Sequence, residues 1–157
     1  MALFRCVQIP CRLHGFTVYN TVQKGATSGI VSKYIPDEVI HTWVEVYFEG
    51  TWYTLEGVII DKTYLRSLQT KFAGHTGPFC GYGVGVEDFE NPPIDWECND
   101  TYIQKSAIGK DFDTYDAPDD FSKQYSQPLS PLKKVAYQYF GRHIMNRNVK
   151  RIRKHKR

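Results

Sequence analysis

The sequence predicts an α+β domain in which helices pack against an antiparallel β-sheet. Residues 40–57 form two segments of alternating apolar and polar residues joined by Glu49-Gly50, a pattern typical of a β-hairpin. Residues 11–19 alternate in the same way, whereas residues 62–72 place apolar side chains at helical spacing. Because strands joined by a two-residue turn are antiparallel, we expect the sheet to be centred on the hairpin.

Length and composition predict one domain with one core. The chain has 157 residues, of which 41% are apolar and 15% aromatic. We expect the domain to span residues 1–148 and residues 149–157 to form a disordered basic tail. The sequence contains neither an apolar stretch long enough to cross a bilayer nor a secretory leader, which predicts no membrane span and a cytoplasmic location.

The four cysteines, at positions 6, 11, 80 and 98, include no Cys-x-x-Cys pair. This spacing favours reduced, buried or partly buried thiols over a disulfide framework or a metal site. The glycines at 81, 83 and 85 do not form the Gly-x-Gly-x-x-Gly pattern of a dinucleotide site. We therefore expect no metal and no cofactor.

Charge is distributed unevenly along the chain. The net charge is +3, but residues 142–157 carry eight Lys or Arg and no acid, which leaves a net charge of −5 on residues 1–141. Such a tail can bind nucleic acid or an anionic membrane through its charge alone. A disordered solubilising end is the favoured interpretation, because no aromatic residue alternates with these cations as a stacking platform requires.

The elements follow from local patterns in chain order. Residues 1–8 end a helix before Pro10, and Asp61 is placed to cap the helix over residues 62–72. The remaining expected elements are a strand at 29–34, a helix at 118–125, and a helix from Ser130 whose apolar stripe, ending at Ile144, would pack on the body.

Residues 73–116, rich in Gly, Pro and aromatics, are expected to form a long ordered loop that shapes a binding site. Its aromatic residues Tyr82, Phe89, Trp96 and Tyr102 would wall a substrate cleft or form a satellite core, and both interpretations stay open.

The hairpin register brings a histidine and an acid together. If Glu49 and Gly50 are the loop residues, Trp43 lies opposite Glu56, and Glu56 becomes a diagonal neighbour of His41. Diagonal neighbours on adjacent strands lie about 7–8 Å apart at the backbone, within reach of an imidazole and a carboxylate. We therefore expect Glu56 to orient His41 as a base.

Three alternatives to this pair remain. Asp61 could replace Glu56 as the acid, although the register places it beyond the His41 end of the partner strand. His14 could replace His41 as the base, although no acid is predicted opposite it. The pair could also lie on a plain solvated face, but Trp43 and Trp52 on the same face favour a functional site.

Two segments resemble the transglutaminase-like cysteine enzymes, a superfamily that includes papain-like amidases. The sequence His-Thr-Trp-Val-Glu-Val-Tyr from His41, a short turn, Trp52 and the acid Glu56 resemble its His and acid segment. The sequence Ala-Leu-Phe-Arg-Cys-Val-Gln-Ile-Pro-Cys-Arg from Ala2 resembles the end of its nucleophile helix. Glu56 stands where the family more usually has Asp. The resemblance implies a transglutaminase-like, cysteine-proteinase-like fold.

The resemblance also implies a chemistry. In that family a Cys thiolate attacks an amide or ester carbonyl, and the acyl group passes to an amine or to water. His41 would be the base and Glu56 its orienting acid, with a peptide or protein substrate bound among Trp43, Trp52, Tyr82 and Trp96. The family's nucleophile lies ahead of the position that Ala2 matches, so we expect this chain as given to lack thiol-dependent activity. The alternatives are a non-catalytic peptide- or protein-binding module on the same fold and a nucleic-acid-associated protein.

Overall fold

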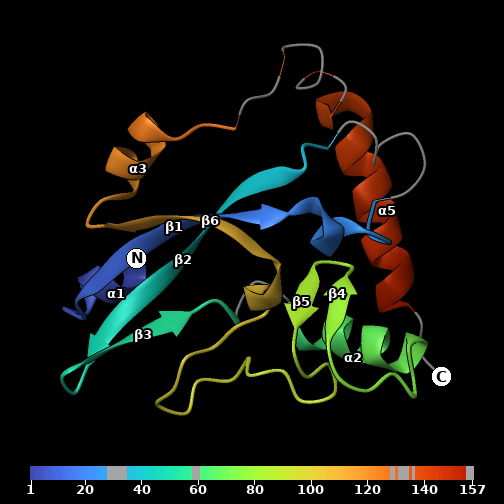
Figure 1. Ribbon diagram of the computed structural model, residues 1–157, viewed down its shortest axis with the longest axis horizontal. Coiled ribbons are helices and arrows are strands. Elements are labelled where there is room, and N and C mark those ends of the chain that lie inside the picture. Colours follow the sequence, from blue (N-terminus) through green and yellow to red (C-terminus); the bar gives the residue numbers. More distant parts are fainter. Residues whose placement is uncertain (28–34, 58–60, 128–129, 131–134, 136, 155–157) are drawn as a thin grey trace.

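The central element is an antiparallel sheet of four strands in the order β3-β2-β1-β6 (Figure 1). The computed structural model describes residues 1–27, 35–57, 61–127, 130, 135 and 137–154. The strands of this sheet are β1 (Cys11–Tyr19), β2 (Glu38–Phe48), β3 (Thr51–Leu55) and β6 (Ile108–Tyr115). The predicted α+β class with an antiparallel sheet is confirmed. Within the described ranges, no helix is long and apolar enough to cross a membrane.

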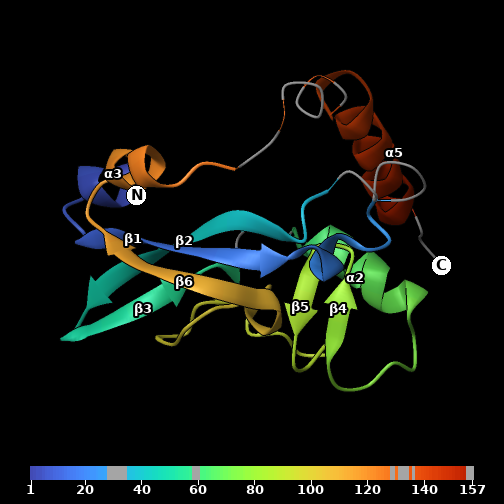
Figure 2. The same cartoon turned by 45° about the horizontal axis from the view of Figure 1, so that its top comes forward.

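Helices lie at both ends of this sheet. In the described residues the α-helices are α1 (Ala2–Cys6), α2 (Lys62–Lys71), α3 (Pro118–Gln124) and α5 (Arg142–Arg153). Short helical segments also occur at η1 (Asn20–Gln23), η4 (Lys105–Ala107) and η5 (Tyr137–Gly141). A second, two-stranded sheet pairs β4 (Phe79–Gly81) with β5 (Val84–Val86). Figure 2 shows α1 and α3 near one end of the larger sheet, and α2, α5 and the β4-β5 pair at the other.

Two apolar clusters form the core. The larger one is built around α2, where helical spacing turns Tyr64, Leu65 and Leu68 to one side. It also contains residues of β4, β5, α5 and the segment between β5 and η4: Phe79, Val84, Val86, Phe89, Ile103 and Ile152. The smaller cluster lies on the larger sheet and consists of Phe16, Val18, Val22 and Ala107. The sheet and the α2 region thus each have an apolar cluster of their own.

The two faces of the larger sheet are covered differently. Gly15 lies on the face opposite His41, and an added Cβ at this glycine would lie 2.2 Å from the Phe121 ring of α3. Helix α3 therefore covers that face, and only glycine at position 15 leaves room for the Phe121 ring. The other face carries Phe16 and His41, which are directly paired across β1 and β2.

Most of the expected local elements are present. Strand β1 and helices α1, α2 and α3 lie within about a residue or two of their expected bounds, and the Asp61 carboxylate accepts a hydrogen bond from Tyr64 N at 2.7 Å, as expected of an N-cap. The strand expected at residues 29–34 lies outside the described residues. Of the four free thiols only Cys11 is buried, so the expectation that all four are at least partly buried was wrong.

Strand β6 was missed, because residues 73–116 were expected to be a loop. Its sequence, Ile-Gly-Lys-Asp-Phe-Asp-Thr-Tyr, has no continuous apolar side, and none of its residues is fully buried. It lies at the edge of the sheet and pairs with β1 through an irregular register. An edge strand with bulges and charged side chains does not need the apolar alternation by which strands are recognised.

The C-terminal segment also differs from expectation. Disorder was expected from residue 149, but α5 continues to Arg153, and Ile152 is only 6% exposed. Val149 and Ile152 lie one helical turn apart and pack on the cluster around α2, while Arg153 pairs with Asp61. Conversely, the stripe expected to pack on the body leaves Val135 and Tyr139 exposed.

Candidate functional site

The turn between β2 and β3 sets the geometry of the site. Glu49 and Gly50 have φ values of 46° and 86°, as a type I′ turn requires. Phe48 pairs with Thr51 and Tyr47 with Trp52, which is the expected register. Strand β3 ends at Leu55, so Glu56 lies one residue beyond the ladder and its backbone turns away to bond with Thr101.

The side chains of His41 and Glu56 meet as the register predicts. His41 Nε2 lies 3.4 Å from Glu56 Oε1, with 24% of the His41 side chain exposed and none of the Glu56 side chain. Both atoms are buried, and among the residues that the structure describes neither has another polar partner. The contact falls just short of hydrogen-bond geometry, and catalytic hydrogen bonds are often long in the absence of a ligand.

The Glu56 carboxylate is held by backbone donors from a distant loop. Its Oε2 accepts hydrogen bonds from Ile103 N at 2.8 Å and Gln104 N at 3.0 Å. Thr101 Oγ1 in turn accepts hydrogen bonds from Glu56 N and Gly57 N, both at 3.2 Å. These contacts fix the rotamer of Glu56 and leave Oε1 directed at His41.

The contact with Glu56 distinguishes the two nitrogens of His41. A proton on Nε2 can be donated to Oε1, which leaves the lone pair on Nδ1. Among the described residues, Nδ1 has no hydrogen-bond partner. This arrangement would let His41 take a proton at Nδ1, with Glu56 beside the resulting imidazolium.

Aromatic rings surround this pair on one side. The Phe16 ring stands edge-on to the His41 ring, and the two ring centroids are 5.2 Å apart. The centroids of the Phe16 and Trp43 rings are 4.3 Å apart. The centroids of the Tyr102 and Trp43 rings are 5.7 Å apart. Burial, with the hydrogen bond that Tyr102 donates to Asp100, raises the pKa of Tyr102 to about 12, so its hydroxyl stays protonated. These rings provide an apolar wall beside the imidazole.

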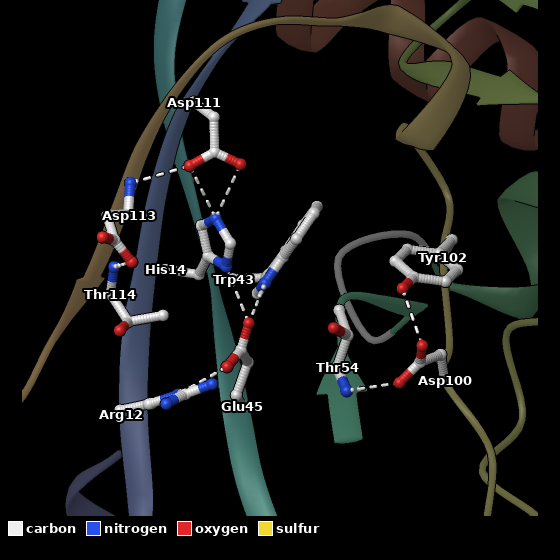
Figure 3. A network of polar contacts seen from close by, with 10 residues as sticks. All are labelled: Arg12, His14, Trp43, Glu45, Thr54, Asp100, Tyr102, Asp111, Asp113 and Thr114. Atoms are coloured by element: carbon white, nitrogen blue, oxygen red, sulfur yellow. Dashed lines mark hydrogen bonds and ion pairs between the residues drawn. The ribbon is translucent and has the colours of Figure 1, made fainter. Parts of the chain in front are cut away.

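A second histidine on the same face has the acids that were not expected of it. Figure 3 shows His14 between two carboxylates: Nδ1 lies 2.7 Å from Glu45 Oε1, and Nε2 lies 3.0 Å from Asp111. Arg12 Nε donates to Glu45 Oε2 at 2.6 Å. Asp111 was missed because β6 was missed. Glu45 could have been found, since it lies diagonally from His14 once β1 is paired with β2.

The charges of this cluster stabilise one another. Burial alone would lower the pKa of His14, but its hydrogen bonds to Glu45 and Asp111 outweigh burial and raise that pKa. Burial likewise opposes ionisation of Glu45, yet hydrogen bonds from His14 and Arg12 lower the pKa of Glu45 overall. Because both ring nitrogens are engaged, His14 joins β1, β2 and β6 and is not free to act as a base.

The four aromatic residues expected to bind substrate are not gathered at one place. Trp43 lies beside the pair, and Trp52 lies on the same face of the hairpin with the Arg12 guanidinium 4.2 Å from its ring. Trp96 contacts Phe48 on the opposite face, and Tyr82 contacts Phe72 in the cluster around α2. A binding role for these four residues stays a prediction, with Trp43 the best placed.

The described residues supply neither a metal site nor a thiol at His41. Within them, no group of three or more His, Cys, Asp or Glu side chains could hold a metal ion. Cys11 Sγ donates to Met1 O and Cys80 Sγ to Thr21 Oγ1, and in this part of the chain no cysteine contacts His41. Comparison with known proteins finds no matching family model, curated protein or solved structure, so the chemistry of the site rests on its geometry.

Proposed function

We propose that His41 and Glu56 are the base and the orienting acid of a thiol acyl-transfer or amide-hydrolysis site in a transglutaminase-like domain. The observation that carries this proposal is the contact between His41 Nε2 and Glu56 Oε1, at 3.4 Å, with no other polar partner for either atom in the described part of the chain. A carboxylate held by two backbone donors and directed at one imidazole nitrogen prepares the other nitrogen for proton transfer.

In this mechanism each group has one role. His41 Nδ1 takes the proton of a cysteine thiol as the sulfur attacks the substrate carbonyl, and Glu56 stabilises the imidazolium. The proton then passes from Nδ1 to the departing amine or alcohol, leaving a thioester. Water or a second amine, deprotonated by the same nitrogen, releases the acyl group. The thiol itself has to be brought to Nδ1, since none of the described cysteines contacts it.

No described cysteine contacts His41, and this favours a second candidate, a non-catalytic module that binds a peptide or protein on the same fold. In that case the apolar wall of Phe16, Trp43 and Tyr102 beside His41 would contact the partner. The two candidates differ in what His41 must do, because only catalysis requires Nδ1 to exchange a proton.

Hydrolysis of p-nitrophenyl acetate near neutral pH tests for a competent base without requiring the thiol. A positioned general base typically raises a reaction rate by about 10²–10⁴-fold. We therefore expect the hydrolysis rate above background to be at least roughly tenfold lower in His41→Ala than in the wild type. The rate of Glu56→Gln should lie between those of His41→Ala and the wild type. His75→Ala is the matched control, since His75 is exposed and bonded to Pro78 O, and it should retain the rate. Equal rates in wild type and His41→Ala would refute catalysis and leave the binding module.

Nitrogen chemical shifts of the histidine rings test the geometry independently. We expect the neutral His41 ring to carry its proton on Nε2 in the wild type and to lose this preference in Glu56→Ala. A ring protonated on Nδ1 in the wild type would show that Glu56 does not orient His41.

A further inference from the structure

Helix α5 and the turn η5 before it present one continuous exposed face. Five residues on this face, here called the α5 stripe, recur at spacings of three or four and are all exposed: Tyr139, His143, Arg147, Lys150 and Lys154. Such spacing places them one above another along a helix. The opposite side of α5 is the one that buries Ile152 and packs Val149 on the cluster around α2. The α5 stripe therefore faces away from the body.

No acid among the described residues pairs with the cations of the α5 stripe. Residues 131–157 contain ten Lys or Arg and no Asp or Glu, whereas residues 1–130 carry a net charge of −7. In the described part of α5 only Arg153 pairs with an acid, Asp61. Arg147, Lys150 and Lys154 thus repel one another along the exposed face, and an anionic surface would relieve this repulsion.

Exposed aromatic side chains adjoin the cations at one end. Tyr137, Tyr139 and Phe140 are 52%, 64% and 69% exposed and lie in η5, directly before α5. Figure 1 shows α5 at the rim of the molecule, with its C-terminal end beside α2. Nucleic acid would favour aromatics interleaved with cations as stacking platforms. Tyrosines are instead enriched at the level of lipid headgroups, and grouped cations are attracted to anionic lipid.

We propose that the α5 stripe docks on the surface of an anionic phospholipid bilayer. Arg147, Lys150 and Lys154 contact lipid headgroups, and Tyr139 and Phe140 enter the interface between headgroups and acyl chains. The acidic body is repelled by the same surface, so the molecule is oriented with α5 toward the bilayer. This proposal does not depend on the chemistry proposed for His41.

Co-sedimentation of the full chain with vesicles tests the proposal. We expect binding to vesicles of phosphatidylcholine with phosphatidylserine, no binding to phosphatidylcholine alone, and weakening at high salt. Lys150→Glu combined with Lys154→Glu should lower the partition coefficient by roughly thirtyfold or more, because each basic residue near an anionic surface contributes measurably to binding. Lys110→Glu combined with Lys123→Glu makes the same change of charge on exposed residues of β6 and α3, outside α5, and should have a far smaller effect.

A second variant separates docking from folding. Tyr139→Ser combined with Phe140→Ser changes only exposed side chains and should weaken vesicle binding while circular dichroism stays unchanged. Three results would overturn the proposal: no binding to anionic vesicles, equal loss in the control and α5 charge variants, or binding to duplex DNA, measured by fluorescence anisotropy, in the absence of vesicle binding. The last would identify nucleic acid as the partner.

Discussion

At the scale of single residues, the two histidines of the sheet face differ in how their nitrogens are used. His41 has one nitrogen against Glu56 and the other without a partner among the described residues. His14 has both nitrogens bonded to carboxylates. The same side chain on the same face thus keeps one nitrogen without a partner in the described residues in one case, and in the other uses both nitrogens in contacts that raise its pKa.

Stability should depend on pH through His14. Its folded-state pKa is raised above 6.5, so the stabilisation is complete below pH 6.5 and is lost as the pH rises through the folded-state pKa. We expect the difference in free energy of unfolding between wild type and His14→Gln to be larger at mildly acidic pH than at clearly alkaline pH. Urea unfolding at both pH values measures it. A difference that does not change with pH would mean that His14 is not held as a cation.

The Glu49-Gly50 turn offers a second test at this scale. Glu49 adopts a φ of 46°, which a residue other than Gly, Asn or Asp tolerates poorly. Because Asn-Gly is the preferred type I′ sequence, we expect Glu49→Asn to raise the free energy of unfolding by about 1 kcal/mol, the lower end of the cost of a left-handed residue other than Gly, Asn or Asp. Thermal unfolding followed by circular dichroism measures the change. A lower melting temperature would contradict the assigned turn.

At the scale of elements, the loop before η4 holds the acid of the site. Thr101 is 2% exposed, and its hydroxyl accepts from two backbone N–H groups and donates to Thr54 O at 3.3 Å. The loop thereby joins the end of β3 to Ile103 and Gln104, which hold the Glu56 carboxylate. The position of Glu56 depends as much on this loop as on the hairpin.

Replacing Thr101 by Val keeps the shape of the side chain but removes its hydroxyl. Gly57 N loses its acceptor and Glu56 N keeps only its bond to Thr101 O, so we expect the free energy of unfolding to fall by about 1–3 kcal/mol. Thr101→Ser keeps the hydroxyl and should be clearly more stable than Thr101→Val in urea unfolding. Equal losses in the two variants would show that packing of the methyl group, not the hydrogen bonds, is what Thr101 contributes.

At the scale of the whole molecule, the positions of the thiols predict how the chain reacts with alkylating reagents. Cys6, Cys80 and Cys98 are exposed and Cys11 is buried, and none of them contacts His41 in the described part of the chain. We expect iodoacetamide near neutral pH to label the three exposed thiols at similar rates and Cys11 slowly, with no change in His41→Ala. A single thiol that labels fast and loses this reactivity in His41→Ala would be the nucleophile.

The sequence by itself determined the features that depend on neighbours in the chain. The two-residue turn set the β2-β3 register and so brought His41 to Glu56. The periodicity of residues 62–72 with the cap at Asp61 specified α2. These features are readable because a turn, a cap and a side-chain period each involve residues only a few positions apart.

Only the tertiary structure decided the contacts between distant segments. Asp111 reaches His14 across 97 positions, and Thr101 reaches Glu56 across 45. The same holds for Ile152, whose burial against α2 extends the last helix beyond its expected end. A local sequence pattern does not predict such pairings. The edge strand β6, the Thr101 loop and Ile152 are each stabilised only once distant segments have packed against them.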